Sequence, residues 1–148
     1  MVRWRTRVGG HPPLRAAITK GMPDLPPGWS PHAALGDEGV ARLIERFFHH
    51  MNTLPEASGV RAMHSEDLGV IKKKLTLFFK GWMGGPREYS KLFPDAPPVP
   101  AAHASYPISQ REIDAWLLCM EKALTDVAPA DLEEFAAIVM PGIRQMAA

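Results

Sequence analysis

The sequence predicts an all-α protein. Four segments repeat large apolar residues at the three- and four-residue spacing of a helix, and no segment alternates apolar and polar residues convincingly enough to predict a strand. Proline, glycine and helix-capping residues separate these segments from one another. The chain has 148 residues, of which 46% are hydrophobic and 22% charged, and this composition suits one globular domain with a sizeable core.

The first helix is predicted from about residue 31 to just before Pro55. The residue before a proline is pushed out of helical backbone geometry, so Leu54 marks the end. The polar residues between the apolar ones include His49 and His50, which are adjacent, cannot share a ligand on one face, and are predicted to lie on the surface. The apolar stripe consists of Val40, Leu43, Ile44, Phe47, Phe48 and Met51.

The second helix is predicted to end abruptly at Gly84-Gly85-Pro86, because glycine relaxes the backbone and proline cannot continue the hydrogen-bond ladder. A short helix is predicted over residues 87–92. Residues 94–107 then contain five prolines and are predicted to be mostly irregular. The apolar stripe of the second helix consists of Ile71, Leu75, Phe78, Phe79 and Trp82.

The third helix is predicted to start at a capping box, in which Ser109 and Glu112 satisfy free backbone N–H groups. The fourth helix is predicted to start near Pro129 and Asp131, and Pro141-Gly142 is predicted to kink it or fray its end. The third stripe consists of Ile113, Trp116, Leu117, Met120, Leu124 and Val127, and the fourth of Leu132, Phe135, Ala136, Val139, Met140 and Ile143.

Residues 1–29 differ from the remainder in being rich in arginine and proline, and they are predicted to form a flexible extension before a globular domain at residues 30–148. They lack the continuous apolar core of a secretory signal, and no stretch of the chain approaches the roughly 20 apolar residues of a membrane span. A single cysteine, Cys119, excludes an internal disulfide and suits a reducing cytosol. We therefore expect a cytoplasmic protein without a membrane partner, and the net charge of +1 provides no broad field for binding nucleic acid.

One histidine in the sequence indicates a specific chemical role. His103 lies in the proline-rich segment just before the helix that carries Trp116. A lone imidazole beside apolar helices can hold haem iron, but such a histidine is more often an ordinary loop or core residue. The many aromatic side chains likewise fill a small helical core or enclose a flat apolar ligand, and periodicity does not separate these alternatives.

An ordered set of motifs gives stronger evidence. The set consists of Arg46-Phe47-Phe48, Arg61-Ala62-Met63-His64, Lys74-Leu75, residues 81–89 (GWMGGPREY), His103, and residues 114–120 (DAWLLCM). Together these segments resemble the truncated haemoglobins, most closely group II, in which tryptophan occupies the position of Trp116. The resemblance covers about residues 31–146 and implies a globin-like two-over-two helical sandwich that holds haem b, iron protoporphyrin IX. The Gly84-Gly85 pair matches a glycine motif of that family, whereas an earlier glycine pair is reduced here to Gly36-Asp37.

The resemblance also implies roles for individual residues. His103 matches the proximal iron ligand, although alanines at positions 101 and 102 stand where relatives usually carry basic residues. Lys74 matches a basic position that faces the haem propionates, and Tyr89 is expected to reach a propionate as well. Ile71, Leu75 and Phe78 are expected to form apolar walls of the haem site.

On the distal side, Trp116 matches a tryptophan whose indole N–H donates to the bound ligand. His64 matches a variable position at the distal rim, where a side chain can donate to ligand or water, although a solvent-facing loop histidine is nearly as plausible a reading. Phe48 departs from the family, which most often has tyrosine there; the ring is kept and the hydroxyl donor is lost.

These roles lead to three functional hypotheses. The first is a haem b protein that reversibly binds oxygen or another diatomic ligand such as NO or CO. The second is a haem redox enzyme at the same site, a nitric oxide dioxygenase or a peroxidase-like enzyme, which takes its electrons from a separate reductase. The third is a helical interaction module that has kept the fold and lost the cofactor.

Overall fold

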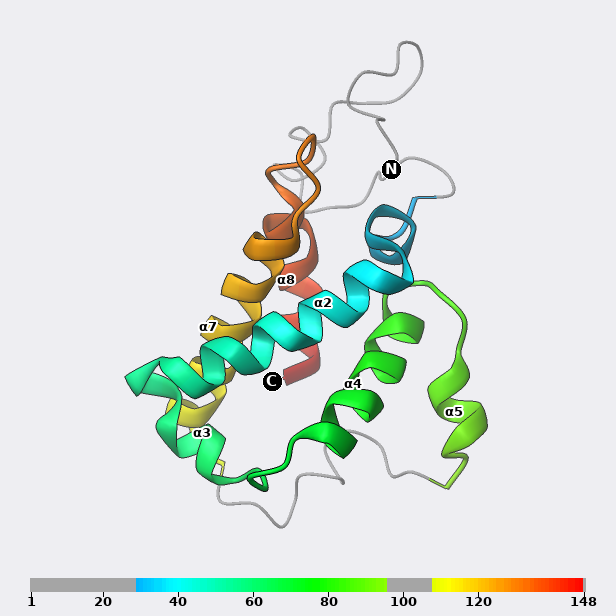
Figure 1. The fold of residues 1–148 in the computed structure, drawn as a ribbon. Helices are drawn as coiled ribbons and strands as arrows, with labels where there is room; N and C mark the ends of the chain where they lie inside the picture. Colours follow the sequence, from blue (N-terminus) through cyan, green and yellow to red (C-terminus); the bar gives the residue numbers. More distant parts are fainter. Residues whose placement is uncertain (1–28, 96–107, 148) are drawn as a thin grey trace.

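The computed structural model describes residues 29–95 and 108–147, and the regular structure of these residues is entirely helical (Figure 1). This confirms the predicted all-α class. In chain order the elements are α2 (Pro31–Thr53), the 3-10 helix η2 (Pro55–Ala57), α3 (Ser58–Ala62), α4 (Gly69–Trp82), α5 (Glu88–Leu92), α7 (Gln110–Val127) and α8 (Phe135–Ala147).

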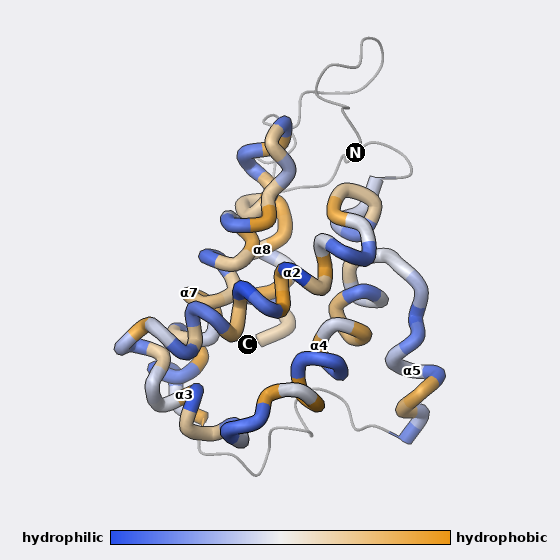
Figure 2. The backbone as a smooth tube through the Cα atoms, viewed as in Figure 1, coloured by the Kyte–Doolittle hydropathy of each residue, from blue (hydrophilic) through white to orange (hydrophobic). Residues whose placement is uncertain are grey.

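The long helix α2 organises the packing. It contacts both α4 and α7, while α7 packs against α8 and α4 against α5 (Figure 1). The pair α2 and α4 therefore lies on the pair α7 and α8, as predicted for a two-over-two sandwich. Figure 2 shows hydrophilic and hydrophobic residues interspersed along α2, α4 and α7, as expected for helices with one buried side.

The predicted stripe of α2 forms the centre of the core, because all six of its residues are almost completely buried. The helix starts with Ser30, whose hydroxyl accepts a hydrogen bond from the backbone N–H of Ala33 at 2.9 Å. It is kinked at Gly36, where φ is +73°, and this is the glycine of the reduced motif. The helix ends at Thr53, since Leu54 has the extended backbone expected before Pro55.

The glycine pair after α4 brings the end of that helix against the start of α2. Gly84 has φ +100°, and a Cβ built on it would lie 2.7 Å from Cβ of Ser30. A Cβ on Gly85 would lie 2.8 Å from the ring of His32, and the backbone N–H of His32 donates to the Met83 carbonyl at 3.0 Å. Only glycine permits this close approach of the two chain segments.

Helix α7 starts with the predicted capping box, in which the backbone N–H of Ser109 donates to Oε1 of Glu112 at 2.9 Å. Helix α8 starts at Phe135, later than predicted. Residues 129–134 form turns, in which the backbone N–H of Leu132 donates to the Pro129 carbonyl at 2.9 Å. The predicted start is wrong because proline and aspartate favour a turn as readily as a helix start.

Helix α8 does not end at Pro141-Gly142, where a kink or a frayed end was predicted. Helix α8 continues through Pro141 to Ala147. Pro141 is exposed, whereas Met140 and Ile143 on either side of it are buried in the core. Burial of these neighbours stabilises the helix beyond the missing N–H group.

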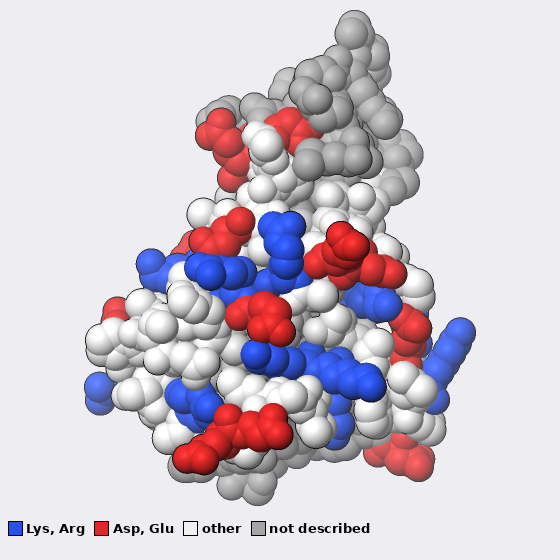
Figure 3. All heavy atoms as spheres, in the orientation of Figure 1, with Lys and Arg blue, Asp and Glu red and all other residues white. Residues whose placement is uncertain are grey.

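The surface bears mixed charges. Figure 3 shows basic and acidic side chains interspersed over the face in view, without a broad region of one sign. Within residues 29–95 and 108–147, no helix combines the length and the apolar character that a bilayer crossing requires.

Candidate functional site

Three of the predicted site residues are connected through a row of aromatic rings, here called the first aromatic row: Trp116, Phe47, Phe48 and His64. Successive ring centroids are 5.2 Å apart between Trp116 and Phe47, 5.0 Å between Phe47 and Phe48, and 5.7 Å between Phe48 and His64, all edge to face. The row runs from α7 through α2 to the loop after α3. Phe47 thus connects the three residues that were expected on the distal side.

The ends of this row carry its polar groups. The Trp116 ring is half-buried, and its indole N–H has no hydrogen-bond partner among the described residues. His64 is also half-buried, and its Nδ1 lies 3.0 Å from the carbonyl oxygen of Val60. Phe48 between them is completely buried and brings no polar atom.

A second aromatic row joins α4 to α5 and consists of Phe79, Phe78, Tyr89 and Phe93. The Phe78 and Tyr89 centroids are 5.5 Å apart, and those of Tyr89 and Phe93 are 5.1 Å apart. The ammonium nitrogen of Lys74 lies 5.1 Å from the centroid of the Phe93 ring, a cation–π contact. Lys74 and Tyr89, both predicted to face the propionates, thus share Phe93 as a neighbour.

Phe93 was missed by sequence reasoning. It follows Tyr89 by four residues, a spacing that places side chains together on one face of a helix. That spacing could have identified it, but the predicted short helix ended at residue 92, and α5 does end at Leu92.

Helix α4 presents an apolar face that is only half-buried. Ile71, Leu75 and Phe78 follow the i, i+4, i+7 spacing and pack against the core, yet each is incompletely covered. In the same stripe Phe79 is buried, whereas Trp82 is 37% exposed, so the prediction that Trp82 belongs to the buried face is wrong. The Trp82 ring instead lies at the surface against Gly142, where a Cβ would come within 3.2 Å of the indole.

The residue types at this site fit haem. Half-buried apolar side chains on α4 suit the flat face of a porphyrin, and a lysine at their edge suits its carboxylates. A free indole N–H suits a polar ligand on the metal. His103, the predicted iron ligand, lies outside the described residues and stays a prediction. Within residues 29–95 and 108–147 no three histidine, cysteine or carboxylate side chains gather in a way that could hold a metal ion.

A separate depression of about 530 Å³ adjoins the loop that carries His64. None of the other predicted site residues lines it. Its lining comes from the end of α2, η2, α3 and the following loop, and consists of Met51, Asn52, Thr53, Leu54, Pro55, Ser58, Arg61, Ala62, His64 and Glu66. His64, the last ring of the first aromatic row, therefore also borders this depression.

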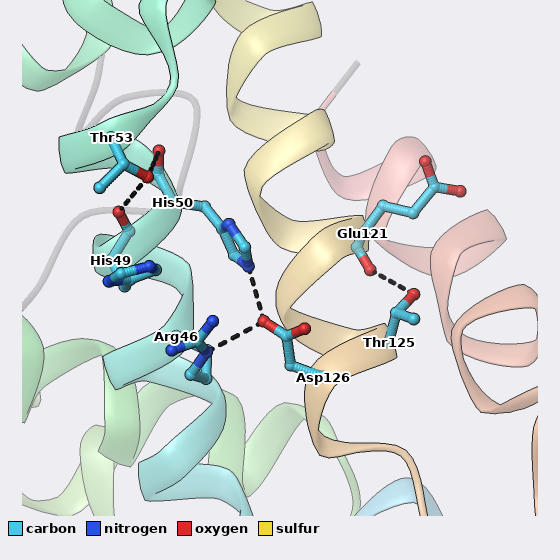
Figure 4. A network of polar contacts seen from close by, with 7 residues as sticks. All are labelled: Arg46, His49, His50, Thr53, Glu121, Thr125 and Asp126. Carbon is cyan, nitrogen blue, oxygen red and sulfur yellow. Dashed lines mark hydrogen bonds and ion pairs between the residues drawn. The ribbon is translucent and has the colours of Figure 1, made fainter.

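His50 does not lie on the surface as predicted. Its side chain is only 15% exposed, and Nε2 lies 2.6 Å from Oδ2 of Asp126 on α7 (Figure 4). Arg46, one helical turn earlier, donates from Nε to the same oxygen at 3.0 Å. His49 is exposed, as predicted. No pattern in the sequence indicates this contact, because α2 and α7 meet only in the folded chain.

The pKa of Asp126 reflects this environment. Partial burial opposes its ionisation, but the hydrogen bonds from His50 and Arg46, followed by their charges, outweigh burial and hold the pKa below its ordinary value. The ionised carboxylate thus joins α2 to α7.

Comparison with known proteins identifies the family of the chain. Residues 32–147 match the family described as Bacterial-like globin. The group 2 truncated hemoglobin YjbI of Bacillus subtilis (strain 168) is 28% identical over 107 residues, which cover 72% of this chain and 78% of that protein.

Two solved structures have the same fold. The group II 2-on-2 hemoglobin of Agrobacterium tumefaciens superposes with a TM-score of 0.72 at 32% identity, covering 82% of this chain and 93% of that one. The cold-adapted truncated hemoglobin of Pseudoalteromonas haloplanktis TAC125 superposes with a TM-score of 0.73 at 28% identity, covering 80% and 94%. The predicted likeness to group II truncated haemoglobins is confirmed, and the chain belongs to the bacterial-like globins, a family of haem- and ligand-binding proteins.

Proposed function

We propose that this protein holds haem b through His103 and reversibly binds oxygen or another diatomic ligand, NO or CO, at the haem. The observation that carries the proposal is the indole N–H of Trp116, which has no partner among the described residues and ends a row of packed aromatic rings. A hydrogen-bond donor at this position suits a polar ligand that is bound to the haem iron.

Several residues of the chain would hold the cofactor. Ile71, Leu75 and Phe78 supply apolar walls that exclude water from its faces. Lys74 and Tyr89, brought together by Phe93, meet its carboxylates. Haem, when bound, supplies a metal with a coordination position for a small ligand.

The residues on the distal side set how well that ligand is retained. Trp116 donates to it, while Phe48 contributes shape and no hydrogen bond. We therefore propose weaker retention of oxygen than in relatives that carry a tyrosine hydroxyl at this position. We also propose a cytoplasmic location, with a separate reductase that would keep the iron reduced.

An absorption spectrum tests haem binding. The purified full-length chain, mixed with haem, should show a protein-bound Soret band and a ferrous carbon monoxide form. The variant His103→Ala should lose or strongly weaken that band, while the control His49→Ala, which changes an exposed histidine, should retain it. A folded chain that stays colourless with excess haem would contradict the proposal and favour a helical module without cofactor.

A second measurement separates a carrier from an enzyme. The reduced, haem-loaded protein should bind and release oxygen reversibly, with unchanged spectra after repeated cycles. Rapid conversion of nitric oxide to nitrate, or turnover of peroxide with a reductant, would instead favour the redox enzyme.

A further inference from the structure

His64 is held by a backbone carbonyl group. Its Nδ1 lies 3.0 Å from the carbonyl oxygen of Val60. A carbonyl oxygen has no hydrogen to donate, so Nδ1 must carry the proton of this hydrogen bond. A neutral imidazole has only one N–H, and Nε2 of His64 therefore presents a lone pair.

The loop around this histidine is held in place by Arg61. The guanidinium donates to the carbonyl oxygens of His64 at 3.4 Å, Ser65 at 3.1 Å and Glu66 at 3.2 Å. Its Nε also donates to Oδ1 of Asn52 on α2 at 2.5 Å. The partner of Nδ1 is a backbone carbonyl of α3, and the loop that carries His64 is braced by Arg61, so the tautomer is a property of the local fold.

The other ring nitrogen, Nε2, meets no hydrogen-bond donor in the part of the chain that the structure describes. Among the described residues Nε2 has no hydrogen-bond partner. The adjacent ring, with centroids 5.7 Å apart, belongs to Phe48, which has no hydroxyl. The polar groups at the two ends of the first aromatic row are therefore one N–H of Trp116 and one lone pair of His64.

We infer that His64 is a hydrogen-bond acceptor in the ligand site and selects ligands that carry a hydrogen of their own over ligands that carry none. A ligand such as water or hydrogen sulfide can donate a hydrogen bond to this lone pair. Carbon monoxide can only accept a hydrogen bond, and its oxygen atom would lie against the lone pair of Nε2. This inference rests on the proposed function, since it concerns ligands of the bound haem.

The stretching frequency of bound carbon monoxide reports the polarity beside it. A lone pair disfavours electron transfer from the metal into the antibonding orbital of carbon monoxide and raises the frequency, whereas an N–H donor lowers it. The substitution His64→Leu should therefore lower the frequency in the ferrous form. It should also weaken the binding of hydrogen sulfide to the ferric form by about tenfold, the equivalent of one hydrogen bond.

The matched control is His49→Leu, which changes an exposed histidine of α2 and should alter neither measurement. A rise in the frequency with His64→Leu would identify a donor and overturn the inference. An unchanged frequency or an unchanged affinity for hydrogen sulfide would overturn it as well, because His64 would then not face the ligand.

The tautomer itself can be measured in the unaltered chain. The ¹⁵N chemical shifts of the His64 ring, assigned with the variant His64→Gln, distinguish a protonated Nδ1 from a protonated Nε2, both without haem and in the carbon monoxide form. We expect Nδ1 to be protonated in both, and a proton on Nε2 would overturn the inference. Failure to bind haem would contradict the proposed function and with it the ligand selection, whereas the nitrogen shifts of the haem-free chain decide the tautomer separately.

Discussion

We propose that the hydroxyl group missing from Phe48 tunes the ligand site without changing the packing. The ring is completely buried between Phe47 and His64, so it belongs to the hydrophobic core. A tyrosine hydroxyl, which the family resemblance implies for this position, would add a donor to a ring that is already in place. Function at this residue is therefore separable from stability.

Replacing Phe48 by tyrosine should slow the dissociation of oxygen from the haem-loaded protein. A hydrogen bond to a partly charged ligand contributes on the order of 1.5–3 kcal/mol, which corresponds to roughly a 10- to 100-fold slower rate. Stopped-flow displacement of oxygen by carbon monoxide measures the rate. The control Phe48→Leu adds no donor and should not slow dissociation; an unchanged rate in the tyrosine variant would refute this description of the pocket.

Cys119 should be chemically inert in the native protein. Burial, reinforced by the negative charge of Glu56, raises the pKa of its thiol to about 11, and the side chain is fully inaccessible. Only the thiolate reacts readily with disulfide reagents. At pH 8 the folded chain should therefore react with Ellman's reagent far more slowly than the chain in guanidinium chloride. Equal rates in the two conditions would show that this helix is not packed as described.

At the scale of elements, close contacts at helix ends hold the arrangement together. The turn after α4 meets the start of α2 through Gly84 and Gly85. Near the other end of α2, His50 and Arg46 bind Asp126 of α7. Both contacts join segments that are distant in sequence, so each can be tested by its effect on the whole fold.

Gly84→Ala should destabilise the protein by on the order of 1–3 kcal/mol, because its φ of +100° is strained for alanine and the new Cβ would lie 2.7 Å from Ser30. Urea unfolding monitored by circular dichroism measures the change. The matched control is Gly59→Ala in α3, where the new Cβ has only an ordinary contact at 3.6 Å from Glu112. That variant should be neutral or more stable by about 0.5–1 kcal/mol, since alanine favours a helix. Equal losses in both variants would contradict the geometry of the turn.

Asp126→Asn should destabilise the protein by about 0.5–1 kcal/mol at neutral pH, the usual range for a partly exposed ion pair. The pKa of Asp126 is lower in the folded state than in the unfolded state, so its contribution is present above the ordinary value of about 3.9. The contribution is lost as the pH falls through the lowered folded pKa. The difference between the two proteins, measured by urea unfolding from pH 7 to pH 2.5, should therefore disappear at the acid end.

The control for this experiment is Asp95→Asn, which changes an exposed aspartate and should leave stability unchanged at each pH. A difference between wild type and Asp126→Asn that persists at low pH would show that the side chain contributes through packing instead of charge.

At the scale of the whole molecule, the fold holds a large apolar face on α4 that is incompletely covered. A ligand that binds only the folded state and covers this face must stabilise the fold. The cofactor is thus expected to be part of the stability of the protein as well as of its chemistry.

Haem should raise the thermal unfolding midpoint of the chain. With free haem at 100 times its dissociation constant the gain is about 2.7 kcal/mol, and each kcal/mol corresponds to roughly 2–4 °C for a chain of this size. Thermal unfolding followed by circular dichroism at 222 nm, with and without haem, measures the shift. His103→Ala should show a much smaller shift; equal shifts in both proteins would indicate haem adsorbed outside the predicted site.

The sequence predicted the elements better than the contacts between them. The stripe of α2, its end before Pro55 and the capping box of α7 were all correct, because each depends on residues within a few positions of one another. The start of α8 was wrong, since the proline and aspartate before it serve a turn as well as a helix. The resemblance to truncated haemoglobins supplied Phe48, His64 and Trp116, which periodicity alone could not distinguish from ordinary core.

By itself, the sequence determined the helical class, the order of the helices and the family, because helical periodicity and ordered motifs are local and linear properties. Only the tertiary structure decided that His50 reaches Asp126, that Phe93 joins Lys74 to Tyr89, and that Nδ1 of His64 lies against the Val60 carbonyl. These are contacts of direction and distance between side chains or across turns. They exist once the helices are packed, and residue order alone does not encode which atoms then face one another.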